Sequence, residues 1–263
     1  MNNKLKISLE KGDVVYGPWC TIPSAAVINI IAATGVDFVI IDMEHGPHSF
    51  ETVEDMIRAA EVEGCSAIVR VAKNEEALIL SALDIGACGI IVPHIENRDD
   101  AESAISFTKY YPLGTRGFSP FTRAGGYSLY NAKDHAKRQN EKTLLILLLE
   151  GKAGIGNLEE ILSIGDIETK VDAIYIGAYD LSQALGFPGQ VDHPDVRGTM
   201  ERCIARITKS RIAAGGYVAK DENDIRCMRD MGMQFITLMP DCTMLFHAFE
   251  NTYHDFLKNK KTN

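Results

Sequence analysis

The sequence lacks the segments that would place it in or across a membrane. Its longest uninterrupted apolar run is the six-residue stretch LLILLL at 144–149, whereas a membrane-spanning helix needs roughly 18 apolar residues or more. The first residues, MNNKLKISLEKGD, contain no apolar core of the kind that a secretory signal requires. We therefore predict a cytoplasmic protein with no membrane partner.

Informative cysteine patterns and basic surfaces are also missing. The six cysteines show no C-x-x-C spacing, so cysteine-ligated zinc is poorly supported, and we expect reduced, packed thiols. The 27 Lys and Arg residues are outnumbered by 36 Asp and Glu residues, which gives a formal net charge of −9. No basic stripe with interleaved aromatic residues occurs, so we expect no nucleic-acid partner.

What the chain does contain is a regular alternation of short β-branched runs and longer stretches of helical period. The stretch 49–64 is representative, with Ser49 as a helix start and Gly64 as a helix stop. Its apolar face consists of Val53, Met56, Ile57 and Ala60. The strand-like runs are 14–20, 37–42, 67–71, 89–93, 144–150, 173–177, 215–219 and 235–239.

These strand-like runs are apolar on both faces, which indicates a parallel sheet covered by helices on both sides. Eight of them in one chain match a single-domain (β/α)8 TIM barrel spanning residues 1–263 better than an open doubly wound sheet, which stays as the alternative. The segment 110–142 is too long for a simple connector. It is predicted to be a functional loop followed by a short helix.

In such a barrel the C-terminal ends of all strands open onto one face, where catalytic groups gather. Polar residues follow most of the predicted strands at this point of the chain. They are Asp42, Glu44, His45, Arg70, His94, Glu150, Asp180 and Asp241.

Glu150 and Asp180 are the candidate metal ligands, because a hard divalent ion such as Mg²⁺ or Mn²⁺ is commonly held by one or two carboxylates. Two other interpretations remain open. Asp180 could be only the N-cap of the following helix, and Glu150 could be paired with a Lys or Arg.

His45 is the candidate general base, since histidine is the side chain whose ordinary pKa lies nearest neutrality. Asp84 could orient its imidazole or merely be a solvated helix end. Arg70, the one charge in its strand, is expected to hold a carboxylate or enolate, whereas His48 and His94 are expected at the rim or in packing. A base, a cation and a divalent metal together suggest proton or carbon chemistry beside a carbonyl.

At these residues the chain resembles the HpcH/HpaI family of metal-dependent class II pyruvate aldolases. The resemblance extends over nearly the whole chain and rests on four segments. They are DFVIIDMEHGPHS (37–49), DIGACGIIVPHIENRDDAESAI (84–105), YPLGTRGFSPFTRAGGY (111–127) and GAYDLSQALGFPGQVDHPDV (177–196).

The resemblance implies a (β/α)8 barrel that forms a homohexamer, a trimer of dimers, with the last helix exchanged between neighbouring subunits. It implies His45 as the base with Asp84 as its partner, and Arg70 as the group that holds the pyruvyl moiety.

The resemblance further implies Glu150 and Asp180 as ligands of a divalent ion (Mg²⁺, Mn²⁺ or Co²⁺). The backbone around Gly177 and Ala178 would receive the substrate carboxylate.

The chain departs from the family pattern at three places. Leu148 stands where many members have glutamine, KNEEA (73–77) replaces a tryptophan-asparagine-aspartate-proline stretch, and RAGGY (123–127) replaces the commoner arginine-alanine-serine form. These changes leave open which aldehyde serves as the acceptor.

Three functions follow from these residues. The preferred one is an aldolase that reversibly cleaves a 4-hydroxy-2-oxo acid, or a 2-keto-3-deoxy sugar acid, to pyruvate and an aldehyde. The second is a condensing enzyme on the same site, similar to the citrate synthases of siderophore pathways. The third is a barrel that binds a 2-oxo acid without chemistry.

Overall fold

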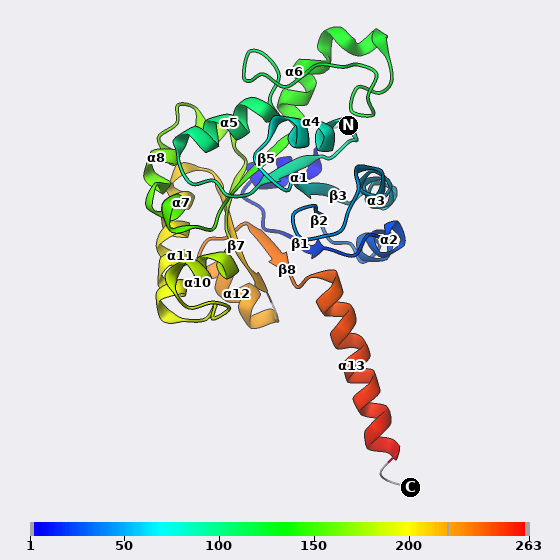
Figure 1. Ribbon diagram of the computed structural model, residues 1–263, viewed down its shortest axis with the longest axis vertical. Helices are drawn as coiled ribbons and strands as arrows, with labels where there is room; N and C mark the ends of the chain where they lie inside the picture. Colours follow the sequence, from blue (N-terminus) through cyan, green and yellow to red (C-terminus); the bar gives the residue numbers. More distant parts are fainter. Residues whose placement is uncertain (1–2, 220, 261–263) are drawn as a thin grey trace.

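Eight parallel strands form a closed barrel in the computed structural model, which describes residues 3–219 and 221–260 (Figure 1). Each strand pairs with the next, and β8 pairs with β1 to complete the ring. The strands are β1 (Val15–Cys20), β2 (Phe38–Asp42), β3 (Ser66–Arg70), β4 (Gly89–Val92), β5 (Leu144–Leu149), β6 (Ala173–Ile176), β7 (Ala213–Ala219) and β8 (Phe235–Leu238). The predicted (β/α)8 barrel is confirmed, and the open sheet is wrong.

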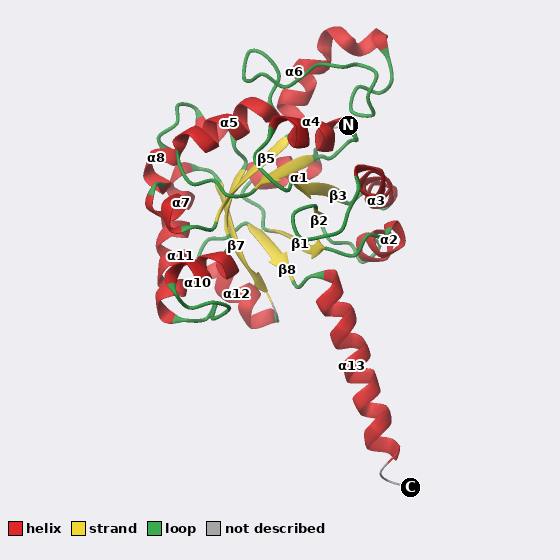
Figure 2. Ribbon diagram, in the orientation of Figure 1, coloured by secondary structure: helices red, strands yellow, loops and turns green. Residues whose placement is uncertain are grey.

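Helices surround the strands on the outside of the barrel (Figure 2). The α-helices before β5 are α1 (Lys4–Glu10), α2 (Ala25–Ala32), α3 (Phe50–Val62), α4 (Glu76–Asp84), α5 (Arg98–Thr108) and α6 (Ala132–Lys142). Those after it are α7 (Lys152–Gly156), α8 (Leu158–Leu162), α9 (Ile167–Lys170), α10 (Ala178–Leu185), α11 (Pro194–Ile207), α12 (Glu222–Asp230) and α13 (Asp241–Lys260). Two short 3₁₀ turns are η1 (Leu129–Asn131) and η2 (Thr208–Ser210).

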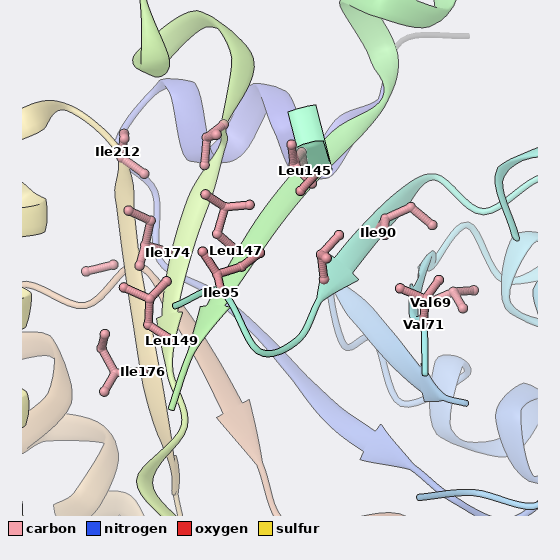
Figure 3. Packing of buried hydrophobic residues seen from close by; sticks show 14 of the residues in the cluster. Val69, Val71, Ile90, Ile95, Leu145, Leu147, Leu149, Ile174, Ile176 and Ile212 are labelled. Carbon is pink, nitrogen blue, oxygen red and sulfur yellow. The ribbon is translucent and has the colours of Figure 1, made fainter. Parts of the chain in front are cut away.

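The continuous apolar sequence of β5 is explained by burial on both faces of the sheet. Successive side chains of a strand point to opposite faces. Leu144, Ile146 and Leu148 therefore belong to the cluster inside the barrel. Leu145, Leu147 and Leu149 belong to the cluster between strands and helices, part of which is seen in Figure 3. A strand with water on one face would alternate apolar and polar residues instead.

The N-terminal end of the barrel interior is closed by aromatic and aliphatic side chains. Phe38 and Phe235 stack with their ring centroids 4.3 Å apart, and both are fully buried. Leu5 and Leu9 of α1 belong to the same buried cluster. This packing leaves the C-terminal ends of the strands as the side on which polar groups can gather.

The helix predicted over 49–64 is confirmed as α3. The Ser49 hydroxyl accepts the main-chain N–H of Thr52 and thereby caps the first turn. The predicted apolar face is fully buried, with Val53, Met56, Ile57 and Ala60 all at 0% exposure. Gly64 follows the helix with φ of +72°, a conformation that glycine adopts at little cost.

Helix α13 begins two residues after β8 and extends away from the barrel (Figure 1). Its aromatic and aliphatic side chains are exposed to solvent in the single chain. They include Met244, Leu245, Phe246, Phe249, Tyr253, Phe256 and Leu257. Among the residues that the structure describes, no helix combines the length and apolar character needed to cross a bilayer.

Candidate functional site

A cavity of about 300 Å³ lies at the C-terminal ends of the strands. Its lining combines charged, aromatic and small residues: Trp19, Thr21, Asp42, His45, Arg70, Leu148, Glu150, Tyr175, Gly177, Ala178, Tyr179, Asp180 and Pro240. A wider hollow of about 1040 Å³ is lined by α1, residues 111–113 and α6, on the side where the strands begin. Because catalytic groups of such barrels collect at the C-terminal ends of strands, the smaller cavity is the candidate site.

Arg70 is held by acidic residues of the neighbouring strand and its loop. Its Nε lies 2.8 Å from Asp42 Oδ1 and its Nη2 lies 2.5 Å from Asp42 Oδ2, a two-pronged contact. This pairing follows from the register, in which Asp42 of β2 lies opposite Arg70 of β3. Nη1 lies 2.9 Å from Glu44 Oε2, and the guanidinium carbon lies 4.7 Å from the centre of the Trp19 ring. The guanidinium is thereby fixed in position and orientation.

These contacts determine the charge state of Asp42 and what Arg70 can still bind. Burial raises the pKa of Asp42, but hydrogen bonding to Arg70 and its charge outweigh burial and lower it below the ordinary value. Of the five N–H groups of an arginine, two donate to Asp42. Nη1 lies at ion-pair distance from Glu44 Oε2 without a hydrogen bond to it, so the N–H groups of Nη1 and the second N–H of Nη2 remain for a ligand in the cavity that Arg70 lines. Asp42 and Glu44 are thus partners of Arg70.

Glu150 is joined to Glu44 through His94. The imidazole places Nε2 2.8 Å from Glu44 Oε1 and Nδ1 3.1 Å from Glu150 Oε1. The main-chain N–H of His94 also donates to Glu150 Oε1 at 3.2 Å. The His94 side chain lies at the rim, as expected, but it bridges two carboxylates. Among the described residues, Glu44, His94 and Glu150 are the group whose ligand atoms come within 4.8 Å of one another.

The surroundings of Glu150 strongly shift the pKa of its carboxyl group. Burial raises its pKa to about 7; the His94 charge opposes this rise, whereas the Asp180 and Glu44 charges add to it. Its ion-pair partner is His94, so the alternative of a Lys or Arg partner finds no support in the described part of the chain. Gly177 lies directly against Glu150, since a Cβ there would come 2.8 Å from Glu150 Cβ.

Asp180 belongs to the first turn of α10, whose N-cap is Gly177. The alternative that Asp180 is the N-cap is therefore wrong. It lies at the third position of the helix and lines the same cavity as Glu150. The two carboxylates predicted as metal ligands thus face one cavity.

His45 lies at the cavity, whereas Asp84 contacts the long loop. His45 lines the cavity, and its main-chain N–H donates to Asp42 Oδ1 at 3.3 Å. Asp84 accepts a hydrogen bond from Arg116 of the long loop at 2.8 Å. Within the described residues no hydrogen bond or ion pair joins Asp84 to His45, so this pairing stays a prediction. Both ring nitrogens of His48 are buried and have no hydrogen-bond partner among the residues that the structure describes.

Several cavity residues were not expected from the sequence. Trp19 lies beneath the guanidinium of Arg70, and Tyr175 meets the Trp19 ring edge-on at 5.7 Å. The Tyr175 hydroxyl lies 2.7 Å from Thr237 Oγ1. The position of these residues in the sequence could have identified them. All of them lie close to the C-terminal end of a predicted strand: Trp19, Thr21, Tyr179 and Pro240.

Known proteins of one family share similarity with this chain over most of its length. The HpcH/HpaI aldolase/citrate lyase family model matches residues 16–248. The hydroxypyruvate/pyruvate aldolase of Roseobacter denitrificans is 32% identical over 247 residues, 94% of each chain. The 4-hydroxy-2-oxo-heptane-1,7-dioate aldolase of Escherichia coli is 31% identical over 95% of this chain and 93% of its own length.

Solved structures give the same result. A HpcH/HpaI aldolase/citrate lyase family protein from Burkholderia cenocepacia has a TM-score of 0.89 at 30% identity, with 97% of this chain and 99% of that chain covered. The citrate synthase SbnG has a TM-score of 0.86 at 30% identity, with 98% of each chain covered.

The raised pKa of Glu150 predicts a pH-dependent stability in the presence of a chelator. Its folded-state pKa of about 7 exceeds the ordinary value of 4.5, so between these values the folded state binds more protons than the unfolded state. The free energy of unfolding should then fall as pH rises from about 4.5 to 7, by up to about 3 kcal/mol.

Urea unfolding with EDTA at several pH values measures this effect. The Glu150→Gln variant, which has no proton to release, should lose that part of the slope. Parallel pH profiles for the two proteins would show that Glu150 has no such shift.

Proposed function

Because the chain belongs to the HpcH/HpaI aldolase/citrate lyase family, we propose that it is a divalent-metal-dependent aldolase, a carbon–carbon lyase. Its substrate is a 4-hydroxy-2-oxo acid or a 2-keto-3-deoxy sugar acid, which it reversibly cleaves to pyruvate and an aldehyde. The observation that carries this proposal is the composition of one cavity, which gathers Arg70, His45, Glu150 and Asp180 at the strand ends.

The residues present fit a divalent ion. Glu150 and Asp180 face the same cavity, and their mutual repulsion is part of what raises the pKa of Glu150. A cation between them relieves that repulsion, and carboxylate oxygens are ligands that Mg²⁺, Mn²⁺ and Co²⁺ accept. Glu150 and Asp180 would hold the ion, and when bound it supplies Lewis acidity to the oxygens of the 2-oxo acid.

The remaining residues carry out the proton and charge steps. His45 takes the proton from the C4 hydroxyl as the C3–C4 bond breaks, and the aldehyde carbonyl forms at C4. The bonding electron pair passes to the pyruvate enolate, whose negative charge meets the N–H groups of Arg70 that do not donate to Asp42. His45 then returns its proton to C3, which gives the pyruvate methyl group.

The substrate carboxylate is placed at the start of α10. The main-chain N–H groups of the first helical turn have no partner within the helix and attract anions. Gly177 and Ala178 begin this helix and line the cavity. A side chain at position 177 would clash with Glu150 and Leu148. Glycine at this position therefore leaves room for the substrate carboxylate and for the metal ligand Glu150.

A second function is a carbon–carbon condensation on the same site. The similarity to the citrate synthase SbnG, which covers 98% of each chain, supports this alternative. In that reaction the enolate forms on the acyl thioester and attacks the keto carbon of the 2-oxo acid. The same residues would serve by holding the keto and carboxylate groups of the 2-oxo acid. The two functions differ in their second substrate, which is an aldehyde for the aldolase and an acyl thioester for the condensing enzyme.

The activity test uses purified protein with pyruvate, a panel of aldehydes and Mg²⁺, Mn²⁺ or Co²⁺, with products identified by mass spectrometry. We expect an aldol product with at least one aldehyde, loss of activity in EDTA and its return with a divalent ion.

A parallel incubation with oxaloacetate and acetyl-CoA, monitored for free CoA, tests the alternative. Full aldol activity after dialysis against excess EDTA would contradict the metal-dependent mechanism.

Arg70→Lys separates catalysis from structure. Replacement by alanine would leave the buried carboxylate of Asp42 without its cation, which costs about 3–5 kcal/mol in comparable pairs, so lysine is the better variant. It keeps the charge but loses the planar fork. We expect kcat to fall on the order of 10²- to 10³-fold. The rate at which the pyruvate methyl protons exchange with solvent should fall as well.

Proton exchange, followed by NMR without any aldehyde, tests enolate formation alone. Circular dichroism verifies that the variant is folded. Exchange at the wild-type rate would show that Arg70 does not stabilise the enolate.

We further propose that α13 packs against a neighbouring subunit in a homohexamer, a trimer of dimers. A helix with this many exposed aromatic and aliphatic side chains is unfavourable in water and is typical of an interface. Light scattering at micromolar concentration should give an oligomeric mass, and removal of residues 244–263 should reduce it. A monomeric mass for the full chain would contradict this proposal. The cytoplasmic location stays a prediction.

A further inference from the structure

Strands β1 and β8 meet where the barrel closes, and their last paired residues are Pro18 and Leu238. Beyond this pair, a carboxylate connects the segments that follow the two strands. Asp241 accepts the main-chain N–H groups of Thr21 at 2.9 Å and Ile22 at 3.1 Å, and the Thr21 hydroxyl donates to it at 3.2 Å. The connection between β1 and β8 is thus continued by one side chain.

The surroundings of Asp241 make this connection a firm one. Asp241 is only 5% exposed, and its Oδ1 also accepts the main-chain N–H of Cys242 at 2.7 Å, so both carboxylate oxygens are engaged. Hydrogen bonds to a charged acceptor are stronger than those between neutral groups, and they are worth more where water is excluded. The segment after β1 is therefore held in one position relative to the start of α13.

The residues held in this way form part of the candidate site. Thr21 lines the cavity, and so does Pro240, the residue before Asp241, whereas Asp241 is not one of the lining residues. The groups that would hold the pyruvyl half of the substrate lie at the ends of β3 and β5 and at the start of α10. C4 and its substituent, which leave as the aldehyde, would therefore lie against Thr21 and Pro240.

We propose that Asp241 is a positioning residue for the aldehyde half of the substrate. It acts through Thr21 and Pro240, which it holds in place at the cavity. A binding wall that is fixed before the ligand arrives loses less conformational freedom on binding. This inference rests on the proposed aldolase function and adds to it a residue that controls the affinity for the aldehyde.

Asparagine is the conservative replacement at position 241. It keeps the size of the side chain but offers one oxygen and one NH₂ group, so the N–H of Thr21 or of Ile22 would meet a donor instead of an acceptor. Asp172→Asn is the matched control. Asp172 also accepts a main-chain N–H, that of Leu145 at 2.8 Å, but it lines the wider hollow on the side where the strands begin.

Steady-state kinetics in the condensation direction tests the proposal. The assay uses saturating pyruvate, Mn²⁺ and glycolaldehyde, or the aldehyde of the panel that gives the most product. We expect Asp241→Asn to raise KM for the aldehyde about tenfold, with little change in kcat. The exchange rate of the pyruvate methyl protons and the affinity for Mn²⁺ should keep their wild-type values, because neither involves the aldehyde. Asp172→Asn should lower the stability without changing KM.

The outcomes separate positioning from a general structural role. An unchanged KM for the aldehyde in Asp241→Asn would overturn the proposal, and so would an equal rise in Asp172→Asn. Slower methyl exchange in Asp241→Asn would also contradict it, because the residue would then act on the pyruvyl half. A lower mass of this variant in light scattering would trace the effect to lost subunit contact and count against positioning. If the wild type condenses pyruvate with none of the aldehydes, the proposed function itself is wrong and the inference fails with it.

Discussion

The buried ion pair between Arg70 and Asp42 is the interaction on which the site depends. It joins β2 to β3 at their C-terminal ends, where the register sets the two residues opposite each other. Because the guanidinium is held by two oxygens of Asp42, it can hold Glu44 in turn. Glu44 contacts His94, and His94 contacts Glu150 at the end of β5. A continuous series of polar contacts therefore runs across the strand ends from β2 to β5, and each member is oriented by the one before it.

The fold could be predicted from the sequence because burial on both faces leaves a clear pattern. The six apolar residues of β5 have no polar partner face, and such strands occur where helices cover a parallel sheet. Closure of the sheet is not encoded in that periodicity; it followed from the number of strands and from the family resemblance. The exposure of the aromatic and aliphatic side chains of α13 could not be read from the sequence. Periodicity identifies a face that avoids water without identifying the surface that covers it.

The site was only partly predictable, for a different physical reason. The strand-end rule located Glu150, Asp180, His45 and Arg70 in one cavity. It could not reveal that Asp42 neutralises Arg70, since that depends on the alignment of two strands. The bridging position of His94 depends on a left-handed backbone conformation that a non-glycine residue adopts rarely. The contact of Asp84 with Arg116 spans 32 residues and depends on the path of the long loop, which has no periodic signal.

The two sides of the cavity are anchored in different ways. Arg70 is the last residue of β3 and Glu150 directly follows β5. The side chains of both strands are packed on both faces of the sheet. Thr21 and Pro240, on the other side, belong to loops, and these are tied together by Asp241. Its carboxylate accepts the main-chain N–H groups of Thr21 at 2.9 Å and Ile22 at 3.1 Å, and Asp241 is also the first residue of α13. The wall formed by these loops therefore shares one anchor with the exposed helix. In the proposed mechanism, the groups that would form the enolate are fixed by the barrel itself. The wall beside Thr21 is positioned instead by Asp241, the first residue of the helix that we propose to contact a neighbouring subunit.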